Sequence, residues 1–195
     1  VVLFQVSYAR MTVSLLSSAF LTVSIFSTTG FTTQDYSVWP FSLGFFLLVC
    51  SLFASCSGST GGGVKMIRML VMLKQIVLTI NKLLRPRDYL PLRIGDDVIS
   101  EKIVTTVFAF LALHLMVMLT CSFIVMITGV PFLDAVSSII ACIANTGVGL
   151  GSVGPSGNYA DCNPVHLWVG AFCMFVGRLE LFTVFAIFTP AFWRN

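Results

Sequence analysis

The stretch Gly58-Ser59-Thr60-Gly61-Gly62-Gly63 interrupts a long apolar part of the chain. Residues 41–56 before it carry no charge, and residues 64–84 after it are apolar with four basic side chains. Four glycines in six residues end a helix, because glycine loses the most backbone entropy on becoming helical. In lipid the freed N–H and C=O groups have no water to bind, so such a break persists only where protein or a water-filled cavity surrounds it. The stretch therefore predicts a broken membrane helix beside a transport pathway.

Composition indicates a membrane protein. Of the 195 residues, 57% are hydrophobic and 10% are charged, whereas soluble domains carry about 25% charged residues. Eight of the eleven basic residues lie between positions 65 and 102, so the positive-inside rule places this segment on the cytoplasmic side. We expect no nucleic-acid partner, because the basic cluster joins hydrophobic spans. The six cysteines form no CxxC pair, so neither a disulfide framework nor a zinc site is expected.

A short apolar segment followed by a Thr-Gly strip occurs twice. Residues 19–27 precede one strip and residues 132–144 precede the other, and the two Thr-Gly pairs are 117 positions apart. After each strip comes an outer loop with one acid, Asp35 or Asp161, and then a further apolar helix. The pattern predicts an all-α membrane protein with repeated units of helix, re-entrant pore helix and helix, as in a potassium-channel-like pore.

The two strips have the composition of a cation filter. A potassium filter replaces the ion's water shell with backbone carbonyl oxygens, and glycine permits the backbone angles that this requires. Neither strip contains a carboxylate, which argues against a divalent-cation site. We expect potassium, and no other metal, to bind the backbone of the strip residues Thr28, Thr29, Gly30, Phe31, Asn145, Thr146, Gly147 and Val148.

Several longer strings resemble the TrkH family of bacterial potassium-uptake proteins, within the wider Trk/Ktr/HKT superfamily. The resemblance covers nearly the whole chain. The strings that carry it begin at Thr28 (TTGFTT-DYS-WP), Gly58 (GSTGGG-K--R), Lys74 (KQ), Ala144 (ANTG-G), Gly177 (GRLELF) and Thr189 (TP-FWR). The resemblance implies four helix–pore-helix–helix units around one pore, of which this chain holds a partial third and a complete fourth. The chain also begins at Val1 within an apolar pattern and without a signal peptide, which predicts a piece of a longer protein.

This comparison sets the expected organisation. The third unit spans 1–84, with a partial first helix, a pore helix and filter at about 16–33, and a broken second helix at 40–84. A cytoplasmic loop follows at 85–99. The fourth unit spans 100–195, with a first helix at 100–130, a pore helix and filter at 132–149, and a second helix at 165–193.

The resemblance further implies the biological setting. Potassium is then the transported substrate, with no covalently bound cofactor. The implied partners are the remaining pore repeats of the same protein, a second copy in a homodimer, a TrkA-like nucleotide-binding regulatory subunit in the cytoplasm, and the lipid bilayer. The implied location is the bacterial inner membrane, crossed several times.

In this family the glycine-rich break acts as a gate, which implies a gating role for residues 58–63 together with Arg178. Independently, the 16 residues of 41–56 reach about 24 Å, short of the roughly 30 Å hydrocarbon core, so the break falls inside the membrane. Arg178 lies 117 positions after Gly61, at the matching level of the other unit. A phosphate-binding loop is excluded, because Val64 occupies the position of the required lysine.

Three alternatives remain open at this stage. In the first, the break is a passive kink. In the second, Arg178 is a structural residue paired inside the protein. In the third, the chain is part of a secondary carrier whose broken helices bind a small substrate at mid-membrane. An enzyme is disfavoured, because the sequence offers no paired carboxylates, no HExxH and no plausible Ser/His/Asp set.

Overall fold

A computed structural model describes residues 2–53, 56, 61–85, 91–95, 97–179, 181–189 and 193. The regular structure of the described part is helical apart from one hairpin of two short strands, which agrees with the expected all-α class. The helices are α1 (Val2–Phe26), α2 (Phe41–Phe53), α3 (Met66–Leu84), α4 (Glu101–Ile127), α5 (Phe132–Ala144), α6 (Pro164–Leu179) and α7 (Leu181–Phe188). Two 3-10 turns, η1 (Tyr36–Val38) and η2 (Gly151–Val153), lie in the loops, and β1 (Arg93–Ile94) pairs antiparallel with β2 (Asp97–Val98).

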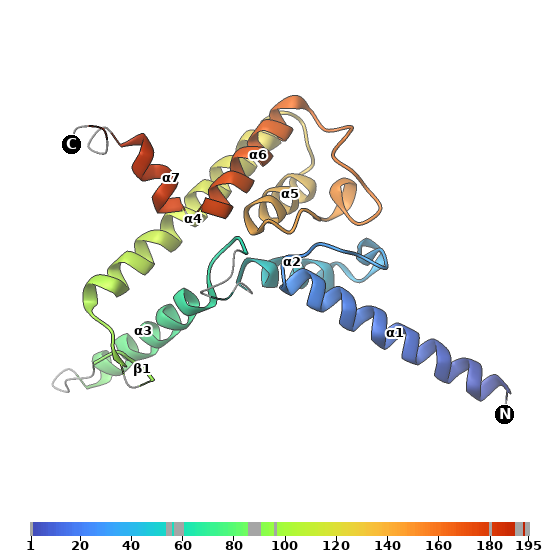
Figure 1. Ribbon diagram of the computed structural model, residues 1–195, viewed down its shortest axis with the longest axis horizontal. Helices are drawn as coiled ribbons and strands as arrows, with labels where there is room; N and C mark the ends of the chain where they lie inside the picture. The colour runs from blue at the N-terminus through green and yellow to red at the C-terminus, as the bar shows by residue number, and fades with distance from the viewer. Residues whose placement is uncertain are drawn as a thin grey trace.

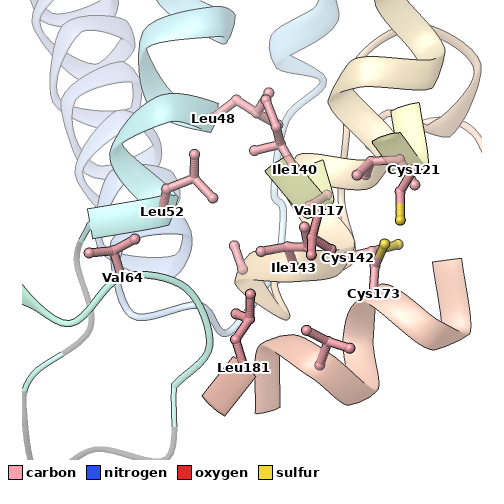
Figure 2. Packing of buried hydrophobic residues seen from close by; sticks show 14 of the residues in the cluster. Leu48, Leu52, Val64, Val117, Cys121, Ile140, Cys142, Ile143, Cys173 and Leu181 are labelled. Carbon is pink, nitrogen blue, oxygen red and sulfur yellow. The ribbon is translucent and has the colours of Figure 1, made fainter. Parts of the chain in front are cut away.

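Helix α5 lies at the centre of the packing. It contacts α2, α4 and α6, and Figure 1 shows it beside α6 and above α2. Nine of its 13 residues are buried, including every residue from Ser137 to Ala144. Figure 2 shows apolar side chains of α2, α4 and α7 directed at Ile140 and Ile143 of this helix. At about 20 Å, α5 is too short to cross a hydrocarbon core, so it has the dimensions of a re-entrant helix.

Helix α4 supports this centre along one side. Its 27 residues extend for about 40 Å, and among the described residues it is the one helix long and apolar enough to cross a membrane. The helix ends at Ile127, and Gly129 follows with a φ of +90°. The first helix expected at 100–130 corresponds to α4, and α5 lies within the range 132–149 expected for a pore helix and filter.

The second helix expected at 40–84 is interrupted, and its first part ends before residue 56. Helix α2 ends at Phe53 and α3 begins at Met66. The chain returns to the end of α2, where the N–H of Val64 donates to the carbonyl of Leu52 at 2.7 Å. Of the glycine stretch, Gly61, Gly62 and Gly63 lie in this loop, whereas residues 58–60 lie outside the described residues.

Two expected boundaries are wrong. The sequence predicts one helix over 165–193, but α6 ends at Leu179 and α7 begins at Leu181 with a change of direction (Figure 1). Hydropathy does not detect this change, because apolar residues lie on both sides of it. At the other end, the partial first helix and the pore helix of the third unit form one continuous helix, α1, which contains no glycine or proline to end it. The loop at 85–99 also contains the unpredicted β1–β2 hairpin.

Candidate ion filter and gate

The two Thr-Gly strips adopt the same backbone conformation. Each begins with a residue in the left-handed region, Thr28 with a φ of 55° and Asn145 with a φ of 58°. Two positions later each has a glycine with positive φ, 78° at Gly30 and 81° at Gly147. These four angles match at an offset of 117 positions. The sequence repeat is therefore also a repeat of backbone geometry.

Hydrogen bonds at the start of the strips repeat as well. In the first strip the N–H groups of Thr29 and Gly30 both donate to the carbonyl of Ser24, at 2.9 and 3.4 Å. The residues 117 positions later make the same two bonds to the carbonyl of Ala141, at 3.0 and 3.2 Å. The N–H groups thus bind the end of the preceding helix. Because these N–H groups are already bound, the backbone groups of the strip that stay available for other partners are its carbonyl oxygens.

The carbonyl groups of the strips accept few hydrogen bonds within the part of the chain that the structure describes. Among the hydrogen bonds of the described residues, none uses a carbonyl oxygen of residues 28–30 or 145–147. The strips also lie side by side, because a Cβ on Gly30 would overlap the carbonyl oxygen of Thr146. A backbone carbonyl normally accepts a hydrogen bond, so a run of unused carbonyls fits a role as ligands for an ion or its water.

Tyr36 lies in the loop after the first Thr-Gly strip (residues 28–31). It binds the end of the second strip (residues 145–148). Its side chain is 2% exposed, and its hydroxyl donates to the carbonyl of Gly149 at 2.7 Å. The carbonyl of Val148 lies 3.3 Å from the same hydroxyl, so this expected filter residue also contacts protein. Sequence reasoning did not identify Tyr36 as a site residue, although its place directly after a strip was a usable signal.

The outer loop after the second strip is held by short polar side chains. The hydroxyl of Ser137 on α5 accepts from the N–H of Leu150 at 3.1 Å. Asp134, also on α5, accepts from the hydroxyl of Ser152 at 2.5 Å. Asp35, one of the two expected loop acids, accepts from the hydroxyl of Ser156 at 2.5 Å. Asp35 thus has a structural role that joins the two outer loops.

Gly62 of the break lies against the end of α5, where the second strip begins. A Cβ on Gly62 would lie 2.8 Å from the carbonyl oxygens of Ile143 and Ala144, at the end of α5. A Cβ on Gly177 of α6 would lie 3.0 Å from the side-chain nitrogen of Asn145. Arg178, the next residue, is exposed and lies in the last turn of α6. The loop and the last turn of α6 therefore meet the same end of the pore helix from two sides.

The comparisons with known proteins agree with this geometry. The family model described as TrkH, a cation transport protein, matches residues 5–194. The chain belongs to the TrkH family. Within this family it is 37% identical to the Trk system potassium uptake protein TrkH of Salmonella typhimurium over 90% of its length, and 36% identical to that of Escherichia coli K12 over 97%. The Trk system potassium uptake protein TrkG of Escherichia coli K12 is 34% identical over 93%.

A solved structure gives the same result. The crystal structure of the potassium transporter TrkH from Vibrio parahaemolyticus matches with a TM-score of 0.84 and 36% identity, over 91% of this chain and 38% of that one. The chain spans 36–38% of the length of these TrkH-family relatives.

Proposed function

We propose that the chain forms two of the four walls of a potassium pore. In this proposal ions cross the membrane through a filter lined by the backbone of residues 28–31 and 145–148. Its relatives are named as potassium uptake proteins, which supports potassium as the transported ion and a transport role without enzymatic chemistry. The observation that carries the proposal is the matched pair of strips, with similar backbone φ angles and with carbonyls at 28–30 and 145–147 that accept no hydrogen bond from the described residues.

The proposal includes a gate below the filter. Residues 58–63 would form a loop that closes the pore, with Arg178 beside it as a second barrier to cations. The position of Gly62 against the end of α5, and of Gly177 against Asn145, supports this role. A passive kink would need no contact between the loop and the pore helix.

The proposal also covers the membrane location and the partner subunits of the full protein. The full protein would sit in the bacterial inner membrane as a homodimer, with the other pore repeats in the same chain and a TrkA-like regulatory subunit on the cytoplasmic side. A secondary carrier remains the second candidate, because broken helices also occur in carriers. The unused carbonyls of two matched strips favour the pore.

Replacing Gly147 with alanine in the full-length protein tests the filter. A φ of +81° is strained for alanine even though the added Cβ would meet no atom within 4 Å, so the strip should change conformation. We expect the permeability ratio of potassium to sodium to fall by about tenfold, as for a loss of about 1.4 kcal/mol of discrimination. Ion flux into proteoliposomes measures this ratio.

Gly129 supplies the matched control for that experiment. Its φ is +90° and a Cβ there would also meet no atom within 4 Å, but it lies between α4 and α5, away from the strips. Gly129→Ala should therefore produce similar strain without a change of selectivity. Equal ion selectivity in Gly147→Ala and the wild type would reject the filter.

Deleting residues 59–62 tests the gate. Shortening the loop should withdraw it from the end of α5 and raise the open probability in single-channel recordings. The expected increase is about tenfold, since a shift of 1.4 kcal/mol in the closed–open equilibrium has that effect. An unchanged open probability would leave the passive kink as the explanation of the break.

A further inference from the structure

Arg68 contacts an aromatic ring directly after the glycine loop. It lies in the first turn of α3, four positions after Val64. Its guanidinium carbon is 4.0 Å from the centroid of the Phe110 ring on α4. Phe110 is 1% exposed, so the contact is screened from solvent on the ring side. A cation over a buried ring is attracted more strongly than one over an exposed ring.

Phe110 also contacts the helix after the second break. Its ring meets that of Phe182 on α7 edge to face, with centroids 5.6 Å apart. The ring of His114, one turn further along α4, stacks on it at 5.8 Å. The ring of Phe110 therefore touches both α3 and α7, the two helices that follow the interruptions of α2 and α6. The Phe110 ring therefore lies at the point on α4 where α3 and α7 meet it.

The glycine loop is attached at its base to neighbouring helices. The N–H of Val64, directly after the loop, donates to the carbonyl of Leu52 near the end of α2. Beyond Val64 the chain passes at once into α3, and Arg68 joins this turn to α4. Further along α3, Val71 packs with Val104 and Val107 of α4. The base of the loop is thus attached to two helices, whereas Gly62 at its inner side faces the end of α5.

We propose that the contact between Arg68 and Phe110 holds the loop in its closed position. Arg68 is then a positioning residue for the gate, and it acts through the start of α3 and not through the pore. This inference rests on the proposed gating function of residues 58–63. Loss of the cation or of the ring would free the first turn of α3, and Gly62 would leave the end of α5 more often.

The test uses potassium flux through the full-length protein in proteoliposomes without a regulatory subunit. Arg68→Met and Phe110→Leu should each raise this basal flux about fivefold, the effect expected from losing one desolvated cation–π contact. Arg68→Lys, which keeps the cation, should restore most of the closed state. Flux is expressed per monodisperse protein, so that a folding defect in one variant does not hide the effect in the other.

Two controls match the variants. Lys74→Met removes a cation from the same helix, but the Lys74 ammonium donates to the carbonyl of Arg93 at 2.8 Å, away from the loop. Phe108→Leu removes a ring from the same helix at a position that is 41% exposed. Neither should change basal flux. Combining Arg68→Met with Phe110→Leu should add little to either variant, because both remove the same contact.

The loop deletion separates this inference from the proposed gate. If the deletion leaves flux unchanged, the gate itself is rejected. If the deletion raises flux but Arg68→Met and Phe110→Leu both leave it at the wild-type level, the gate stands and the inference is overturned. It is also overturned if Arg68→Met raises flux further in the deleted protein, since no loop then remains for it to hold.

Discussion

At the scale of single residues, the buried hydroxyl of Tyr36 donates to one backbone carbonyl and so holds a strip in place. A buried phenol without a partner is unfavourable, and the carbonyl of Gly149 provides that partner at 2.7 Å. The same bond holds the outer end of the second strip in place. The conformation of the strip thus depends on a side chain from a different unit as well as on its own glycines.

Tyr36→Phe should therefore weaken both stability and selectivity. The substitution keeps the ring in its buried position but leaves the carbonyl of Gly149 without this donor, which typically costs about 1–3 kcal/mol. We expect a lower Tm of the purified protein and a reduced preference for potassium over sodium in liposome flux. A variant with a lower Tm but unchanged ion preference would show that Tyr36 supports the fold alone.

At the scale of elements, the end of α5 is approached closely from two sides. Gly62 comes from the loop after α2 and Gly177 comes from α6. Both positions exclude a side chain, because an added Cβ would overlap atoms of the α5 terminus. The approach of these two elements to one helix end places the loop against the start of the second strip.

Gly177→Ala should force α6 away from α5. A Cβ there would overlap the carbonyl oxygen of Ile143, and backbone atoms cannot yield as a flexible side chain does. We expect a loss of about 1–3 kcal/mol in stability, seen as a lower Tm, together with altered basal flux. Gly170→Ala on the same helix is the control, because its Cβ would meet the sulfur of Cys142 at an ordinary 3.4 Å. Equal Tm values for the two variants would contradict the close approach.

Much of this architecture was predictable, since local chemistry determines it. The breaks and strips follow from glycine, and the 117-residue repeat placed Thr28 and Asn145 at equivalent positions before any geometry was known. The change of direction after Leu179 and the cross-unit role of Tyr36 were not predictable. They depend on packing between segments far apart in the sequence, as between Tyr36 and Gly149 or between Phe110 and Phe182, which a hydropathy pattern does not contain. The functional roles of the strips and the loop stay predictions.

At the scale of the whole molecule, the two units are joined on their outer side. Asp35 accepts from the N–H of Ser37 in its own loop at 2.8 Å and from the hydroxyl of Ser156 in the other loop. These two bonds, that from Ser156 first, lower the pKa of the Asp35 carboxyl below its usual 3.8. The join is exposed, so its effect is on the coupling of the loops and not on the core.

The lowered pKa predicts an acid dependence. A carboxyl whose folded pKa lies below its unfolded value stabilises the fold above the unfolded pKa, and this contribution is lost as pH falls through the folded pKa. The Tm should therefore decrease below a pH of about 4. Ser156→Ala should make this decrease shallower, as measured by thermal unfolding across that range. Parallel acid profiles for the variant and the wild type would show that the Ser156 bond does not contribute.

The bond from Tyr36 to Gly149 also limits how such pores can be recombined. A strip transplanted with its own pore helix would arrive without the phenol that holds its outer end, because that phenol belongs to the preceding unit. Chimeras of related pores should therefore be cut so that the outer loop of one unit travels with the strip of the next. The segment that must be moved as a whole then begins in the outer loop of one repeat and ends in the strip of the next.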